Sequence, residues 1–271
     1  MRILYCGDVV GRTGRTAVME ALPSLREDLG LDAVVVNGEN AAHGFGISPK
    51  IADEFFEAGC DVLTTGNHAW DQRDIIPHFD AEPRLIRPAN FPSQTPGRGH
   101  AIIDAGRGRK LLVAQVMGRL FMDPLDDPFR AVDDLLSTYR LKGGIDAILV
   151  DIHGEASSEK MAMGHFCDGR ASIVVGSHTH VPSADIQILP GGTAYQSDAG
   201  MCGDYDSVIG MKKQAATARF VRKMPGERLS PADGPATVCG LFVEIDDATG
   251  LATRAEAVRL GGRLAPAMPA V

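Results

Sequence analysis

The sequence predicts an α/β protein in which two mixed β-sheets pack together and helices cover their outer faces. Short hydrophobic runs alternate with helix-like segments, a pattern typical of βαβ units with parallel strands. Pairs of runs separated by Gly- or Pro-rich turns predict hairpins, so the sheets also contain antiparallel strands. Runs that end in polar residues occur in both halves of the chain. Neither half therefore holds the site alone, and we expect a single domain over residues 1–271.

The first half predicts two βαβ units. Its expected strands cover 3–7, 33–37 and 61–65, and its expected helices cover 16–29 and 49–58. Gly30 and Gly59 are usual helix stops, while Ser48 and Pro49 supply a cap and a proline at the first helical position.

The second half adds hairpins to this alternation. The predicted hairpins pair 100–104 with 110–116, 185–189 with 193–197, and 237–245 with 252–260. Helices at 128–141 and 157–167 alternate with strands at 147–152 and 172–176. Residues 211–235 are polar and basic with weak periodicity, and we expect them to form a mobile insertion.

Composition and charge narrow the class of protein. Hydrophobic content of 44% and charged content of 23% are ordinary for a soluble globular chain. A net charge of −8 argues against a general basic surface, so no stable nucleic-acid binding is expected. The five cysteines form no CxxC pair, and no run matches a secretory signal or a transmembrane helix. We expect a cytoplasmic protein with reduced cysteines and no membrane contact; a homo-oligomer is left open.

Five hydrophobic runs end in side chains that can bind metal ions. The polar residues at these ends are Asp8, Glu39, Asn40, Asn67, His68, His153, His178 and His180. Buried parallel strands end at the carboxyl edge of their sheet, where open α/β sheets place active sites. This repeated pattern predicts a metal centre.

The ligand types indicate the kind of metal. Carboxylate combined with imidazole suits Mn, Fe or Zn, and the lack of cysteine disfavours a structural zinc site. Without His68, the seven candidate ligands exceed the need of one tetrahedral ion and suffice for two if a carboxylate bridges. The alternatives to metal binding are a helix cap for Asp8, a turn role for Asn67, and structural roles for His178 and His180.

The order of these residues resembles the calcineurin-like metallophosphoesterases. The matching motifs span roughly residues 1–200 and comprise Asp8, the acidic residue after Gly38, Gly66-Asn67-His68, His153, and Gly176-Ser177-His178-Thr179-His180. The resemblance implies the calcineurin-like α/β/β/α sandwich and phosphate-ester hydrolysis at two metals. Two motifs depart from the usual pattern: Val10 stands where a histidine is usual, and Gly38-Glu39-Asn40 stands where Gly-Asp-x is usual.

These departures are similar to the YmdB-type branch, which also has stretches like GRTGR at 11–15 and AYQSDAGMCGDYDSVIG at 194–210. The resemblance implies a phosphodiesterase that hydrolyses 2′,3′-cyclic nucleotides, small phosphodiester substrates, through a metal-bound hydroxide. It implies two transition-metal ions per chain, with Fe or Mn favoured over Zn. The implied ligands are Asp8, Glu39, Asn40 and His180 for the first ion, and Glu39, Asn67, His153 and His178 for the second.

His68 is expected to be the catalytic residue, donating a hydrogen bond or a proton to the phosphoryl or leaving oxygen. The alternative for His68 is a packing role. Among the histidines that match no motif, His43 is the strongest candidate for a place in the site. The glycines at 7, 11 and 14 lack P-loop spacing and are expected to let the backbone approach the metal centre. Alternative functions are a phosphomonoesterase or 5′-nucleotidase on the same scaffold, and a regulatory RNA-related protein with weak activity.

Overall fold

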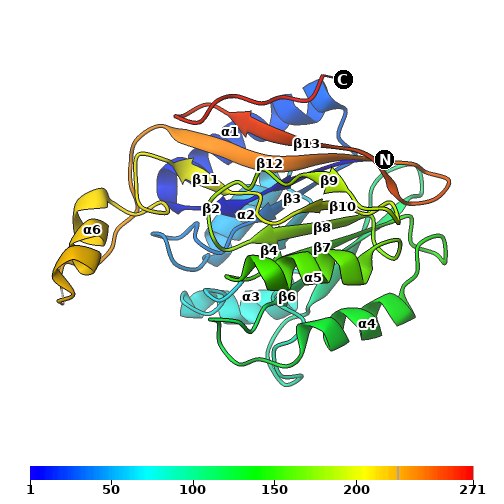
Figure 1. Cartoon of the computed structure of the whole chain (residues 1–271), viewed down its shortest axis with the longest axis horizontal. Helices are drawn as coiled ribbons and strands as arrows, with labels where there is room; N and C mark the ends of the chain where they lie inside the picture. Colours follow the sequence, from blue (N-terminus) through cyan, green and yellow to red (C-terminus); the bar gives the residue numbers. More distant parts are fainter. Residues whose placement is uncertain (225, 271) are drawn as a thin grey trace.

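Two β-sheets pack face to face, with helices on both outer sides, in a computed structural model that describes residues 1–224 and 226–270. Figure 1 shows α1 on the outer side of one sheet and α4 and α5 on the outer side of the other. The predicted α/β/β/α sandwich is confirmed. In the described part of the chain, no helix is both long enough and apolar enough to cross a membrane.

The first sheet has seven strands and is mixed. Its order is β2-β11-β12-β1-β3-β4, with β13 paired to β12. The bounds are β1 Arg2–Cys6, β2 Asp8–Val9, β3 Ala33–Asn37, β4 Val62–Thr64, β11 Met201–Asp204, β12 Ala236–Ile245 and β13 Ala252–Leu260. Strands β1, β3 and β4 run parallel, whereas β12 is antiparallel to both β1 and β13.

The second sheet has six strands in the order β5-β6-β7-β8-β10-β9. The bounds are β5 His100–Asp104, β6 Lys110–Met117, β7 Ala147–His153, β8 Ile173–Ser177, β9 Gln187–Ile188 and β10 Ala194–Gln196. The four central strands are parallel, and the edge strands β5 and β9 pair antiparallel with their neighbours. The predicted hairpins are therefore confirmed.

Helices close the sandwich on both sides. They are α1 Gly11–Leu29, α2 Pro49–Glu57, the 3₁₀ turn η1 Arg73–Ile75, α3 Ile76–Ala81, α4 Pro128–Thr138 and α5 Ser157–Cys167, while a further helix, α6 Lys213–Arg222, stands apart from the sheets. Because each sheet is covered on both faces, its central strands are apolar on both sides. Along β1, for example, Leu4 and Cys6 pack with the α1 side, whereas Ile3 and Tyr5 belong to the core between the sheets.

Several local predictions were wrong. Helix α1 begins at Gly11 rather than at residue 16. Its N-cap residue is Val10, whose side chain cannot form a capping hydrogen bond, so no capping motif in the sequence marks this helix start. Ser48 occupies the N-cap position of α2, but its side chain makes no cap hydrogen bond either. The short strands β2 and β11 were not predicted.

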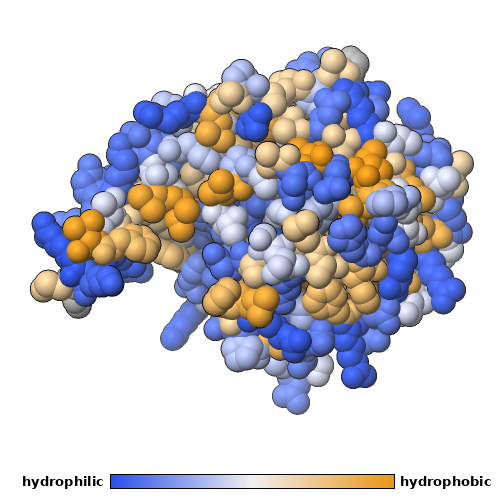
Figure 2. All heavy atoms as spheres, in the orientation of Figure 1, coloured by the Kyte–Doolittle hydropathy of each residue, from blue (hydrophilic) through white to orange (hydrophobic). Residues whose placement is uncertain are grey.

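The polar segment 211–235 contains α6, a helix that the sequence did not predict. In Figure 1 this helix stands away from the sandwich, and Figure 2 shows apolar atoms among the hydrophilic ones on this arm. Phe220, Val221 and Met224 are among its exposed apolar side chains. All five cysteines are free and buried, as expected for reduced core residues.

Candidate metal centre

The predicted ligands meet where strands of both sheets end. Asp8 lies in β2 and Asn67 follows β4, both in the first sheet, while His153 ends β7 and His178 follows β8 in the second. Asn40 is held beside the start of α1 by a bridge to Val10. The parallel strands thus deliver polar side chains from distant parts of the chain to one edge.

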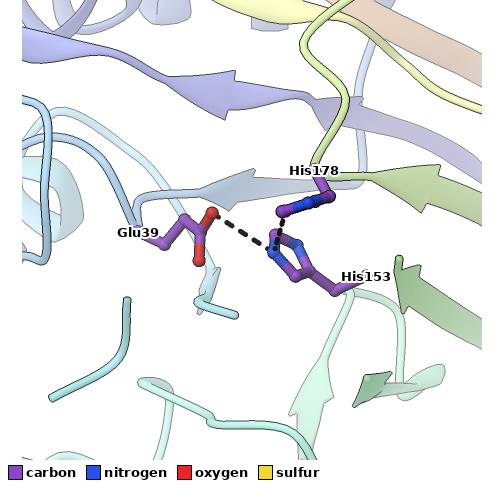
Figure 3. Close-up of side chains that lie close together, drawn as sticks. All are labelled: Glu39, His153 and His178. Atoms are coloured by element: carbon purple, nitrogen blue, oxygen red, sulfur yellow. Dashed lines mark hydrogen bonds and ion pairs between the residues drawn. The ribbon is translucent and has the colours of Figure 1, made fainter. Parts of the chain in front are cut away.

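Glu39 lies between two groups of ligand atoms. One group combines Glu39 with His153 and His178, and the other combines Glu39 with Asp8 and His180; within each group the atoms lie within 4.8 Å of one another. Figure 3 shows Glu39 and His178 both turned toward the ring of His153. Glu39 Oε1 and His178 Nδ1 each lie 3.2 Å from His153 Nε2.

Asparagine side chains complete each group. Asn67 Oδ1 lies 2.8 Å from His153 Nε2. Asn40 Nδ2 lies 3.1 Å from Glu39 Oε1 and 3.2 Å from His180 Nε2. Rotating the Asn40 side-chain amide by about 180° would exchange Nδ2 and Oδ1, so that Oδ1 would face Glu39 and His180. A metal ligand needs this orientation, because only the amide oxygen can bind the ion. The structure therefore brings all seven predicted ligands together.

Each candidate ligand histidine has a polar partner at the ring nitrogen that points away from the other ligands. His153 Nδ1 contacts Ser177 Oγ at 2.9 Å, and His180 Nδ1 donates to the carbonyl of Ile209 at 2.8 Å. His178 Nε2 lies 3.2 Å from a carboxylate oxygen of Glu155. In a neutral imidazole, the nitrogen that donates a hydrogen bond carries the hydrogen, so the lone pair is on the other nitrogen. In each of these histidines, that other nitrogen faces the candidate metal centre. Sequence reasoning missed these supporting residues, although Glu155 lies only two positions after His153.

Burial and mutual charge shift the pKa values of these groups strongly. Burial raises the pKa of Asp8 to about 6, against the opposing attraction of His180 and His153. Burial also disfavours ionised Glu39, but the attraction of His153 outweighs it and lowers the Glu39 pKa to about 2. Burial and the neighbouring charge of His153 lower the pKa of His178 to about 3. Converging carboxylates and imidazole lone pairs in a buried volume form a donor set that fits borderline divalent cations.

The segment from His178 to His180 has an unusual backbone. Both histidines have positive φ, 96° and 66°, so the segment is not extended. Asp198 accepts hydrogen bonds from Thr179 N at 3.0 Å and from Thr179 Oγ1 at 2.7 Å. Asp198 is also paired with Lys160 at 2.8 Å, and both side chains are buried. These contacts hold a backbone conformation that non-glycine residues rarely adopt.

The early glycines allow close packing of the backbone, but against a different partner from the one expected. A Cβ on Gly7 would overlap the carbonyl of Gly200, and a Cβ on Gly14 would overlap that of Cys202. The close approach is therefore to β11 and the residue before it, rather than to the metal ligands. It places Asp8, whose N–H donates to Gly200 O at 3.1 Å.

His68 lies beside the ligand groups but belongs to neither of them. Its backbone N–H donates to Glu39 Oε2 at 3.2 Å, and its Nδ1 lies 2.8 Å from Asp71 Oδ2. The ring of Phe45 meets it edge-on, with centroids 5.2 Å apart. His43 also lies outside both groups, and its side chain is exposed.

The chain is similar to known proteins over nearly its whole length. It is 45% identical to the 2′,3′-cyclic-nucleotide 2′-phosphodiesterase of Bacillus subtilis, covering 95% of this chain and 96% of the relative. A crystal structure of a hypothetical protein from Thermus thermophilus superimposes with a TM-score of 0.90 at 42% identity, covering 97% and 100% of the two chains. A novel phosphatase from Mycoplasma pneumoniae gives a TM-score of 0.89 at 32% identity, covering 96% and 93%.

The family model for YmdB-like proteins matches residues 4–258. This range includes all seven candidate ligands and His68. The chain belongs to the YmdB-like protein family.

Proposed function

We propose that the protein is a dinuclear metal-dependent phosphodiesterase that hydrolyses 2′,3′-cyclic nucleotides. The observation that carries the proposal is the position of Glu39, which is shared by two groups of buried ligand atoms. The activity named for the Bacillus subtilis relative supports the same substrate class. Both sheets contribute to these groups, which supports a single functional domain over 1–271.

The two ions would share Glu39. Asp8, Asn40 and His180 would complete the first set, and Asn67, His153 and His178 the second. Mixed carboxylate, amide and imidazole ligands favour Fe or Mn and also accommodate Zn. When bound, such ions supply Lewis-acid activation of water and of the phosphoryl group.

We assign His68 as the residue that assists the phosphoryl or leaving oxygen. Asp71 accepts the hydrogen on Nδ1, so Nε2 is the nitrogen left to act on substrate. The backbone contact to Glu39 fixes His68 beside the ligands without making it one of them.

A 2′,3′-cyclic phosphate is a compact diester whose leaving oxygen stays attached to the ribose. Little recognition of the sugar is then needed, and we expect modest base preference with weaker action on 3′,5′-cyclic nucleotides. The test compares kcat/KM for 2′,3′-cyclic AMP, 3′,5′-cyclic AMP, a chromogenic diester and a phosphomonoester, with Mn or Fe present. The 2′,3′-cyclic substrate should be strongly preferred.

The phosphatase named among the solved relatives supports a second candidate, a phosphomonoesterase on the same site. Clear preference for a phosphomonoester in this comparison would favour that candidate. No turnover of any phosphate ester would favour a regulatory protein instead. The net charge of −8 supports the absence of stable nucleic-acid binding, and the five reduced cysteines support a cytoplasmic location.

A further inference from the structure

A buried carboxylate lies between the two sheets directly behind the candidate metal centre. Asp151, in β7, is fully buried and accepts hydrogen bonds from side chains of four other strands. Two donors come from the first sheet, Tyr5 OH and Thr64 Oγ1, each at 2.8 Å. The other two come from the second sheet, Gln115 Nε2 at 2.8 Å and Ser177 Oγ at 2.7 Å. Asp151 therefore ties both sheets together.

One of these donors also reaches a predicted ligand. Ser177 Oγ lies 2.9 Å from His153 Nδ1. Because the hydroxyl hydrogen is used on Asp151, the serine oxygen accepts the hydrogen of His153 Nδ1. In the neutral ring that binds a metal ion, the lone pair of His153 is then on Nε2, the atom that faces Asn67 Oδ1 and Glu39 Oε1.

We propose that Asp151 and Ser177 are positioning residues that hold His153 in the tautomer and ring orientation needed to bind metal. Through them, the hydrogen bonds that join the sheets also set the metal affinity of the centre. This inference rests on the metal centre of the proposed function.

The hydrogen-bond partners distinguish the positioning of His153 from a role limited to packing of the two sheets. Tyr5 and Thr64 each donate a hydrogen bond to Asp151, and neither donates one to His153. Ser177 is the donor that connects Asp151 to a ligand. Residues behind metal-bound histidines fix the ring and raise its basicity, and their loss usually weakens metal binding about 10–100-fold.

The test compares Ser177→Ala with Tyr5→Phe, because each substitution removes one hydroxyl donor from Asp151. For each purified protein, Mn²⁺ affinity is measured by competition with a fluorescent chelator, and Tm is measured without metal. Ser177→Ala should weaken one Mn²⁺ site about 10–100-fold. Tyr5→Phe should lower Tm comparably while leaving both affinities within about twofold. Thr64→Val, which removes a third hydroxyl from Asp151, serves as a second control.

Ser177→Thr retains the hydroxyl and should recover most of the affinity, which guards against a folding defect in Ser177→Ala. In protein loaded with diamagnetic Zn²⁺, ¹⁵N shifts of His153 should report a hydrogen on Nδ1 and metal on Nε2 in the wild type, and a mixture of states in Ser177→Ala. Unchanged affinity in Ser177→Ala, or equal weakening in Ser177→Ala and Tyr5→Phe, would overturn the inference alone. A wild-type protein that binds no Mn²⁺ would instead overturn the proposed function.

Discussion

Asn67 Oδ1 lies 2.8 Å from His153 Nε2, although the two residues are 86 positions apart in the chain. Asn67 follows β4, an edge strand of the first sheet, and His153 ends a central strand of the second. The candidate centre therefore exists only where the two sheets meet. Changes at the centre and changes at the sheet interface should consequently affect one another.

Glu39→Gln should reduce metal content and activity together. The substitution removes the negative charge that both ligand groups share, so each ion loses part of its attraction. Elemental analysis after metal supplementation should approach two ions per chain in the wild type and fall clearly below that in the variant. The exposed Glu57→Gln is the matched control. Retention of both ions with near-normal rates would show that Glu39 is not the bridge.

His68→Ala should slow turnover by about 10²–10⁴ while leaving metal content unchanged, because His68 lies outside both ligand groups. Asp71→Asn should give a smaller loss, since it only weakens the support of the ring. Single-turnover rates and elemental analysis check both expectations. His43→Ala controls for loss of an exposed histidine. Metal loss in His68→Ala would mean that this residue is a ligand.

Thr179→Val should weaken metal binding by loosening the segment between His178 and His180. The valine retains the backbone N–H that donates to Asp198 but lacks the hydroxyl. A hydrogen bond to a charged group contributes about 1.5–3 kcal/mol, so the free energy of unfolding should fall by a comparable amount. Denaturant titration and chelator competition measure the two effects. Thr179→Ser should have the metal affinity and the free energy of unfolding of the wild type. If both fall as far as in Thr179→Val, the hydroxyl is irrelevant.

Removal of metal should lower Tm. A ligand that binds only the folded state stabilises it, by about 2.7 kcal/mol when its free concentration is 100 times Kd. Without a cation, buried Asp8 and Glu39 also repel each other and raise the free energy of the folded state. Scanning calorimetry of dialysed protein, with and without added Mn²⁺, measures the difference. Identical transitions in both samples would argue against specific binding at this site.

Gly7→Ala should destabilise the protein. The added Cβ would overlap the carbonyl of Gly200, and neither backbone segment can move without disturbing Asp8. Overpacking of this kind costs about 1–3 kcal/mol. Gly226→Ala is the control, since a Cβ there would meet no atom within 4 Å. Equal unfolding midpoints in urea for both variants would contradict the close approach.

The sequence predicted elements best where hydrophobic runs have clear boundaries. Strand β3 at Ala33–Asn37 and helix α5 at Ser157–Cys167 were predicted to the residue. Strand β2 was not predicted, because two residues carry no periodicity and its pairing with β11 depends on the tertiary fold. Predicted element boundaries were wrong where no capping side chain marked the helix start, as at Val10.

The candidate ligands could be predicted because parallel strands bring their carboxyl ends to one edge. The residues behind them could not. Asp151 is one polar residue inside the run AILVDIH, and nothing local reveals its four donors. Its partner Gln115 lies opposite it only through the register of β6 and β7. Such networks are fixed by packing between sheets, which a pattern along one strand does not encode.

The distance along the chain between the ligands has a consequence for refolding. Asp8 lies near the start of the chain, whereas His180 receives its support from Ile209. Contacts between such distant segments form slowly, because long loops must close first. Tight metal uptake should therefore appear only in the final kinetic phase, after the sheets have docked. An added metal-sensitive dye would then time the last step of folding, while probes of helix formation would respond much earlier.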